Sequence, residues 1–393
     1  MNPNPRIKSQ SGRLRIVVAG YIVRGPLGGL VWHHLQYVMG LARLGHDVYF
    51  IEDSDDYPAC YDAERNLTDC DPTYGLKFAT RVFDRMGLGE RWAYHDAHTS
   101  RWLGPCGERA VEICKDAELL LNLSGMNPKR PWLERIPVRV LVDTDPVFTQ
   151  IRNLVESWTR NRSIWHTDFF TFAENIGRAD SNVPLDGFPW QPTRQPVVLD
   201  AWPVTPGQAN GKFTTVMQWK SYPAAEYNGR RYGMKSESFG PYEDLPNRVG
   251  PIIELAAIGA PEERLRQLGW QFRDGLELTR DPWVYQDYIQ HSRAEFGVAK
   301  HGYVASHSGW FSERSAAYLA SGRPVLAQNT GFDTWLPTGE GVVAFQTPEG
   351  AAAGIDDINR RYESHCTAAR ELVGEYFEAS RVLNSLIERS LAS

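Results

Sequence analysis

The stretch from His307 to Arg323 holds the residues whose types and spacing best suit ligand binding. It reads HSGWFSERSAAYLASGR, so small polar residues lead into a predicted helix that ends near Gly322. Ser312 is suited to cap this helix, whose free N–H groups can hold a phosphate. Glu313 can accept hydrogen bonds from ribose or sugar hydroxyls, or it can simply complement the helix dipole. The binding candidates here are His307, Gly309, Trp310, Ser312 and Glu313, followed by Thr330 and Gly331 after the next predicted strand.

A glycine-rich loop near the start of the chain is a second candidate. It runs from Gly20 to Gly29, between a predicted strand at 16–20 and a predicted helix at 31–42. Its glycines Gly28 and Gly29 let a ligand approach bare backbone at a helix N-terminus. The loop is not GxGxxG, so the usual dinucleotide fingerprint is absent, and a tight structural turn is the alternative.

Basic side chains that could neutralise a phosphate follow the predicted strand at 213–217. The main candidates are Lys220, Arg231 and Lys235, with Arg230 beside them and Lys300 and His301 as weaker ones. Fixed cations of this kind stabilise negative charge on a bound anion. The alternative for each of them is a solvated basic loop.

Four residues are candidates for a catalytic base. Asp143 and Asp145 directly follow a predicted strand at 138–142, where the carboxyl end of a parallel strand places ligand-binding groups. His166 and Glu174 are the alternatives, because either group could take a proton from an acceptor hydroxyl. A structural hydrogen-bonding role is the competing interpretation for each of the four.

These residues are interspersed with short β-branched runs and helical stripes that alternate along the chain. Such alternation predicts an α/β fold with parallel sheets and ligands at the carboxyl ends of the strands. A proline-rich segment at 184–211 lacks periodicity and is predicted to be an interdomain linker. The last forty residues have helical spacing, from Ala369 to Ile387.

Length and composition limit the possible classes of protein. The 393 residues suggest two domains, and the net charge of −6 argues against a nucleic-acid partner. The five cysteines form no CxxC pair, so no disulfide framework and no zinc site is predicted. The N-terminus has no apolar signal segment and no long apolar run occurs, so we expect a cytoplasmic protein without a membrane span.

Three motifs together carry a resemblance to a known family. The step from Ala320 to Val325 is similar to the A-x-G-x-P-V step of GT-B glycosyltransferases, and the stretch from His307 to Ser312 is similar to their H-C-G-W-N-S motif. Gly28-Gly29 followed by GHDV at 45–48 resembles the GG…GHEV opening of family-4-like members. The sequence thus resembles GT-B enzymes of the family-4-like and glycosyltransferase family 1 types.

The resemblance implies two Rossmann-like domains that face a central cleft, with a C-terminal helix that crosses back to the first domain. Residues 14–198 with the returning helix 375–393 would form the acceptor domain, and residues 199–374 would bind a nucleotide sugar. His33 falls where many of these enzymes have a histidine, and the acceptor-binding candidates are Trp32, His33 and Phe170.

The implied activity is a metal-independent transfer of a hexosyl group to a small molecule or glycan, with the nucleotide sugar as co-substrate and no cofactor. We expect a monomer or homodimer. The glutamate pair of family-4-like enzymes is replaced by Gly309 and Ala317, which leaves the donor open. A nucleotide-sugar epimerase, a pseudo-glycosyltransferase and a non-catalytic nucleotide-sugar binding protein are therefore alternatives.

Overall fold

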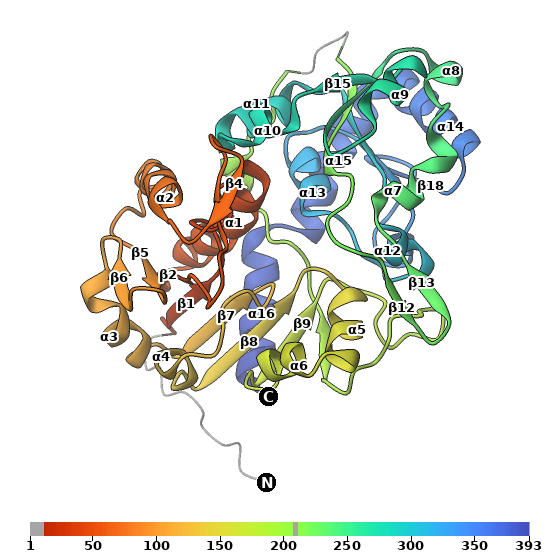
Figure 1. Ribbon diagram of the computed structural model, residues 1–393. Helices are drawn as coiled ribbons and strands as arrows, with labels where there is room; N and C mark the ends of the chain where they lie inside the picture. Colours follow the sequence, from red (N-terminus) through yellow and green to blue (C-terminus); the bar gives the residue numbers. More distant parts are fainter. Residues whose placement is uncertain (1–11, 207–210, 393) are drawn as a thin grey trace.

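The computed structural model describes residues 12–206 and 211–392 and contains two large sheets, each with helices on its faces (Figure 1). The first sheet has the strand order β10-β9-β8-β7-β1-β2-β5-β6, and all neighbours are parallel except β5 and β6. Its strands are β1 Arg15–Ala19, β2 Asp47–Asp53, β5 Trp92–Asp96, β6 Arg101–Leu103, β7 Leu119–Leu123, β8 Val138–Asp143, β9 Asp168–Thr171 and β10 Trp190–Pro192.

The second sheet is parallel throughout and has the order β15-β14-β11-β16-β17-β18. Its strands are β11 Phe213–Gln218, β14 Ile253–Ile258, β15 Gln271–Arg273, β16 Ala294–Gly297, β17 Val325–Gln328 and β18 Val342–Phe345. The remaining strands form two antiparallel hairpins, β3 Cys60–Asp62 with β4 Leu67–Asp69 and β12 Ala225–Tyr227 with β13 Arg230–Tyr232.

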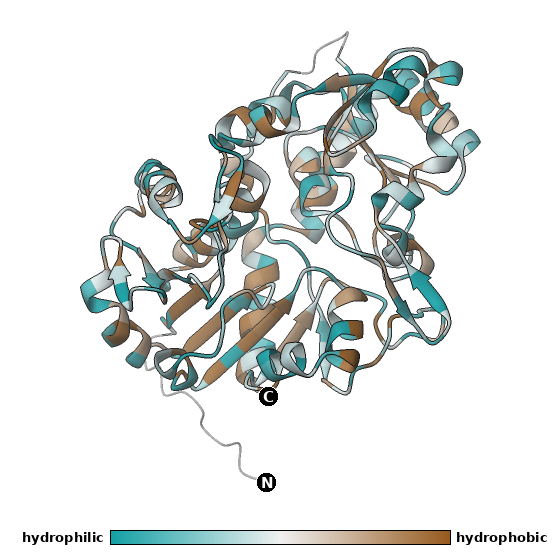
Figure 2. Cartoon of the chain, viewed as in Figure 1, coloured by the Kyte–Doolittle hydropathy of each residue, from teal (hydrophilic) through white to brown (hydrophobic). Residues whose placement is uncertain are grey.

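The helices show the apolar spacing that the sequence displays. Figure 2 shows apolar strands such as β7 and β8 beneath helices whose outer faces are more polar, as expected for helices packed on a sheet. The helices are α1 Gly28–Arg43, α2 Thr73–Arg85, α3 Ala110–Lys115, α4 Pro131–Glu134, α5 Phe148–Val155, α6 Ser157–Ser163, α7 Lys235–Ser238, α8 Pro246–Val249, α9 Glu262–Gln267, α10 Gly275–Thr279, α11 Pro282–His291, α12 His301–Ala305, α13 Glu313–Ala320, α14 Pro348–Arg360, α15 Tyr362–Tyr376 and α16 Ala379–Ala392. None of the helices in the described ranges is long and apolar enough to cross a bilayer.

The end of the chain returns to the first sheet. Helix α15 ends at Tyr376, and α16 then packs against α1 and β8. Gly40 of α1 lies directly beneath α16, because a Cβ built there would approach the side chains of Ala379 and Leu383. The predicted continuous helix is thus interrupted after Tyr376, where the backbone of Val197 bonds to Phe377 and Ala379.

The proline-rich segment differs from a simple linker over its first half. Residues 190–192 form β10 at the edge of the first sheet, the position where proline is tolerated in a strand. Val197 makes an isolated bridge with Glu378, and the side chain of Trp202 is fully buried. This part of the chain is therefore held against the first sheet and the C-terminal helices. The sequence could not predict this, because the contacts of residues 190–202 with the first sheet and the C-terminal helices leave no periodic pattern in the local sequence.

Candidate functional site

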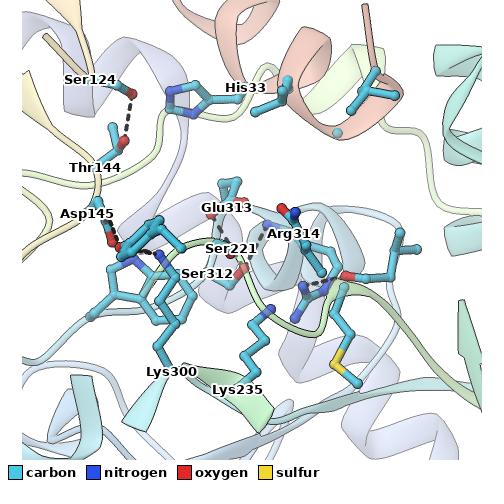
Figure 3. Close-up of a pocket in the computed structure, with 18 of the residues that line it drawn as sticks. His33, Ser124, Thr144, Asp145, Ser221, Lys235, Lys300, Ser312, Glu313 and Arg314 are labelled. Atoms are coloured by element: carbon cyan, nitrogen blue, oxygen red, sulfur yellow. Dashed lines mark hydrogen bonds and ion pairs between the residues drawn. The ribbon is translucent and has the colours of Figure 1, made fainter. Parts of the chain in front are cut away.

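A cavity of about 550 Å³ lies between the two sheets. One wall comes from α1 and the loops that follow β1, β7 and β8, and the other from the loops after β11 and β16 and from the start of α13. These are the carboxyl ends of parallel strands, where ligands of open α/β sheets bind. Figure 3 shows His33 on one side of the cavity and Lys235 and Lys300 on the other. The predicted site residues in its lining are Gly29, His33, Asp143, Asp145, Lys235, Trp310, Ser312 and Glu313.

Helix α13 begins at the cavity as the sequence predicts. Ser312 is its N-cap, and its Oγ accepts a hydrogen bond of 3.2 Å from the backbone N–H of Arg314. Glu313 lies in the first turn and lines the cavity. The helix therefore directs its N-terminal partial positive charge toward the space between the sheets.

Arg314 is a cavity residue that the sequence interpretation missed. Its Nε donates a 2.6 Å hydrogen bond to Oε1 of Glu295, which is fully buried on β16, and one terminal nitrogen donates to the carbonyl of Val216. These two bonds hold the guanidinium at the cavity wall. The place of Arg314 directly after a capping serine and an acidic residue could have suggested a ligand-binding arginine. The sequence did not show that Glu295 and Val216, on two distant strands, would hold it at the cavity.

Lys235 carries the ammonium group whose charge is least balanced by its surroundings. Burial, together with the charge of Arg314 nearby, lowers the pKa of Lys235 to about 7. Among the described residues none forms a hydrogen bond or an ion pair with its Nζ, which points into the cavity in Figure 3. An anionic ligand is the chemical group that would best stabilise the charged form of this lysine.

Asp145 joins the two walls of the cavity. Its Oδ1 accepts hydrogen bonds from Nζ of Lys300 at 2.8 Å and from the hydroxyl of Tyr303 at 2.5 Å, and its Oδ2 accepts one from the hydroxyl of Tyr222. Burial raises the pKa of Asp145, but the charges of Lys300 and Arg152 more than offset this and hold it below its usual value. The carboxylate is therefore ionised, and its oxygens already have hydrogen-bond partners. Lys300, a weaker candidate for phosphate binding from the sequence, lies at the cavity and is now one of the stronger ones.

Asp143 lines the cavity but uses its oxygens to support the loop. Its Oδ2 accepts hydrogen bonds from Gln150 and Thr171, and its Oδ1 accepts one from the backbone N–H of Asp145. Burial raises the pKa of Asp143. The arrangement positions Asp145 and leaves little capacity for a reacting proton.

His33 presents an unoccupied nitrogen at the cavity. Its Nδ1 lies 2.5 Å from Oε1 of Gln195, and the amide nitrogen of Gln195 donates to the backbone carbonyls of His33 and Pro196. The amide oxygen can only accept, so Nδ1 carries the hydrogen. Burial lowers the pKa of His33, so the ring is neutral, and its Nε2 is a buried acceptor without a partner among the described residues.

Three amides of the glycine-rich loop are bonded to a buried carboxylate, while Gly29 at its end lines the cavity. The carboxylate of Glu52, which is fully buried, accepts hydrogen bonds of 2.7–2.8 Å from the N–H groups of Ile22, Val23 and Arg24. Gly28 lies outside the cavity lining, and a Cβ built there would be 2.8 Å from Cβ of Tyr285. The prediction that this loop is a ligand cradle is therefore corrected at Gly28, whose missing side chain lets α1 approach α11.

Two catalytic candidates lie away from the cavity. His166 is buried, its Nδ1 donates to the carbonyl of Ser163 and its Nε2 accepts from Asn122, and burial lowers its pKa to about 3. Glu174 forms an ion pair with Arg194. Both side chains are committed to structural partners and neither belongs to the cavity lining.

Two of the three main basic candidates are also outside the cavity. Lys220 is exposed, and Arg231, on the β12–β13 hairpin, pairs with Glu226 and Glu237. Both therefore follow the alternative of a solvated basic loop. Lys235 differs because the chain turns back at α7 and brings it beneath α13.

The remaining donor candidates, His307, Gly309, Thr330 and Gly331, pack behind the residues that line the cavity. Asn175 of the first domain donates hydrogen bonds to the carbonyls of His307 and Gly331, and the N–H of Gly309 donates to the carbonyl of Thr330. These four donor candidates lie outside the lining of the large cavity. Their contacts fix the loop that carries Trp310, whose ring packs on Tyr303 with centroids 4.4 Å apart.

Two acceptor candidates are packing residues. The indole N–H of Trp32 donates to the carbonyl of Pro282 on α11, and its ring contacts Trp202. Phe170 is fully buried in β9, with the guanidinium of Arg389 over its ring. Of the three acceptor candidates, His33 alone lines the cavity.

Within the described ranges no group of three or more His, Cys, Asp or Glu side chains is arranged to hold a metal ion. The expectation of metal-independent chemistry stays a prediction.

Comparison with solved structures identifies the architecture. An α-glucosyltransferase in complex with UDP-glucose and DNA containing an abasic site matches over 96% of this chain and 100% of its own, with a TM-score of 0.58 and 10% identity. AviGT4, a glycosyltransferase involved in avilamycin A biosynthesis, matches over 97% and 98% with a TM-score of 0.52 and 15% identity. A glycosyltransferase from Rickettsia africae ESF-5 matches over 96% and 98% with a TM-score of 0.54 and 10% identity.

No protein-family description and no curated protein matches the sequence. The chain has the GT-B glycosyltransferase fold, and the resemblance stated from its motifs is confirmed at the level of the fold.

Proposed function

We propose that this protein transfers a hexosyl group from a nucleotide sugar to a hydroxyl group of an acceptor. One observation carries the proposal: Lys235, Lys300, Arg314 and the N-terminus of α13 converge on one cavity between the two sheets. A cluster of cations at a helix N-terminus suits a diphosphate, the group by which a nucleotide sugar is held and which leaves in the reaction. The GT-B fold is in keeping with this use.

The charge arrangement favours cleavage of the bond between the sugar and the diphosphate. Negative charge grows on the leaving oxygen as this bond breaks, and fixed cations stabilise that charge more than they stabilise the bound substrate. Lys235 is the main candidate for this role, because it lacks a counter-ion among the described residues. Metal-independent transfer is part of the proposal, with these side chains in the place of a divalent cation.

His33 is proposed to bind the acceptor. Its Nε2 can accept the hydrogen of an incoming hydroxyl, and the bond from Nδ1 to Gln195 holds the ring in the required tautomer. Glu313 lies between His33 and Lys235 in Figure 3, so it is placed to accept hydrogen bonds from hydroxyls of the transferred sugar. The sugar would leave the diphosphate and bond to the acceptor oxygen near these two side chains.

A ligand screen tests the donor site. Thermal unfolding is followed with UDP, GDP, dTDP and ADP, and one nucleotide is expected to raise the midpoint more than the others. Lys235→Met should remove this rise, whereas Lys220→Met, which changes an exposed lysine outside the cavity, should leave it unchanged. Release of free nucleotide from the matching sugar donor then separates an enzyme from a binding protein. No rise with any of the four nucleotides would refute the donor site.

A further inference from the structure

A second group of side chains lies at the carboxyl edge of the first sheet, outside the cavity. His95 lies on β5, Trp102 lies on β6 and Trp132 lies on α4. The ring of His95 contacts both indoles, with centroids 4.9 Å and 4.6 Å away, and the two indoles are 5.2 Å apart. We name these three residues the aromatic shelf.

The imidazole of the aromatic shelf is held in a fixed orientation. Asp53 accepts a 2.8 Å hydrogen bond from Nδ1 of His95 and two more, of 2.8 Å and 2.9 Å, from the guanidinium of Arg130. Burial would raise the pKa of Asp53, but the bonds from His95 and Arg130 lower it to about 2. The carboxylate can only accept, so Nδ1 of His95 carries its hydrogen and Nε2 is the nitrogen left for another molecule.

Three polar atoms of the aromatic shelf have no partner in the part of the chain that the structure describes. Nε2 of His95 and the indole N–H groups of Trp102 and Trp132 have no hydrogen-bond partner within residues 12–206 and 211–392. His95 is buried between the two indoles, which are half-buried because their inner faces cover the core beneath α3 and α4. The site therefore combines half-buried π-surface with two indole donors and one imidazole nitrogen.

This combination suits a sugar ring. The C–H groups on one face of a pyranose pack against an indole, while its hydroxyls both donate and accept hydrogen bonds. Charges of both signs surround the aromatic shelf, so its match to a sugar depends on the indole faces and the uncharged donors, and the nucleic-acid probe in the experiment below tests the other class of ligand. The charged neighbours are Asp53, Asp55, Asp56, Asp96 and Glu134 with Arg101, Lys129, Arg130 and Arg162.

The aromatic shelf is connected to the cavity through one loop. Ser124 and Met126 of this loop line the cavity, and Asn127 accepts a hydrogen bond from the backbone N–H of Asp53. In the sheet, β5 is three strands from β7, which is about 14 Å at the usual strand spacing. A chain of a few sugar units spans such a distance, whereas a single sugar does not.

We propose that the aromatic shelf binds a neutral hexopyranose unit of a glycan acceptor whose reacting hydroxyl lies in the cavity. The inference rests on the proposed glycosyltransferase function and names the class of its acceptor. It assigns His95, Trp102 and Trp132 to acceptor binding at a distance from the reacting bond.

Fluorine NMR of the protein labelled with 5-fluorotryptophan tests the aromatic shelf directly. The 13 tryptophans are reporters, and Trp102→Phe, Trp132→Phe, Trp158→Phe and Trp310→Phe assign four of the signals. Methyl β-D-glucopyranoside, maltotriose and cellotriose are the saccharide probes, UDP is the donor probe, and a single-stranded oligodeoxynucleotide is the nucleic-acid probe. Trp158, which is 61% exposed on α6, is the reference for non-specific effects.

We expect at least one saccharide to shift the signals of Trp102 and Trp132 and to leave that of Trp158 unchanged. His95→Ala should weaken this binding about three- to tenfold, the loss of one aromatic contact with its hydrogen bond. The inference is overturned if none of the three saccharides shifts the signals of Trp102 and Trp132. It is also overturned if the oligodeoxynucleotide shifts them and the saccharides do not. UDP is expected to shift Trp310 instead, and its failure to do so would count against the donor site and not against the aromatic shelf.

Discussion

Asparagine in place of Asp145 is expected to tighten the binding of UDP. In the ligand-free protein the carboxylate of Asp145 lies 2.8 Å from Nζ of Lys300, at the cavity where the diphosphate is proposed to bind. A diphosphate must displace this carboxylate to reach Lys300, or bind beside a negative charge. The asparagine side chain has nearly the same shape and still accepts a hydrogen bond, but it neither neutralises Lys300 nor repels the ligand.

The magnitude follows from the geometry of the pair. Two unit charges 2.8 Å apart attract by about 6 kcal/mol at the effective dielectric constant of a protein surface, about 20. Most of this attraction is offset by desolvation, and removing one partner also leaves Tyr222 and Tyr303 with weaker acceptors. A net gain of about 1–2 kcal/mol for UDP corresponds to binding that is about five- to thirtyfold tighter.

Titration calorimetry with UDP measures this effect in a double-mutant cycle. The wild type is compared with Asp145→Asn, Lys300→Met and the double variant, and the gain should be smaller in the Lys300→Met background, where only the repulsion of the ligand and the pairing with Arg152 are relieved. Asp56→Asn, an exposed aspartate that pairs with Arg130, is the matched control for a general change of charge. The reasoning is refuted if Asp145→Asn weakens UDP binding, or if its gain is the same with and without Lys300.

Three further predictions concern the cavity and the domain contact. Lys235, whose pKa is about 7, loses its charge as the pH rises, so the affinity for UDP should fall up to tenfold per pH unit above 7. Lys235→Arg is the reference, because its charge persists and its own titration with UDP corrects for the ionisation of the ligand. His33→Ala should lower kcat about 10²–10⁴-fold and leave the Kd of UDP unchanged, and a changed Kd with normal kcat would contradict the acceptor role. Gly28→Ala should destabilise the protein by about 1–3 kcal/mol in urea unfolding, because the new Cβ lies 2.8 Å from Cβ of Tyr285. Gly374→Ala on α15, where nothing lies within 4 Å of the new Cβ, should instead stabilise it by about 0.5–1 kcal/mol.

Local signals in the sequence predicted strand β11 and the start of α13 well. The strand at 213–217 matches β11, and Ser312 caps α13 as its position before the helical stripe indicates. Both features depend on a few neighbouring residues, a β-branched run in one and a short hydroxyl side chain in the other. Asp145 was placed near a ligand because it follows the end of a strand, and Lys235 because it is one of several basic residues in the segment after β11.

Long-range partners decided the residues that the sequence could not place. The amides of Ile22, Val23 and Arg24 are bonded to Glu52, about thirty residues away, so this part of the loop is not available to a phosphate. His166 and Glu174 had suitable chemistry, but their partners Asn122 and Arg194 commit them elsewhere. No local pattern distinguishes a carboxylate that will meet a distant cation from one that will meet a ligand.

The chain has a net charge of −6, yet the proposed ligand is an anionic donor, so the local charge of the cavity decides whether it binds. Four cations line the cavity: Arg314 pairs with Glu295, Lys300 and Arg152 share the single carboxylate of Asp145, and Lys235 forms no ion pair with a described residue. One carboxylate balances only one of the two cations that share it, so part of the charge of Lys300 and Arg152 is left, besides Lys235, to face an anionic ligand. Asp145 and Lys300 come from opposite walls of the cavity, so the same ion pair that joins the walls also sets how much positive charge a diphosphate meets. Removal of this carboxylate in Asp145→Asn leaves both Lys300 and Arg152 without their shared counter-ion, which is the change of charge that the UDP titration measures.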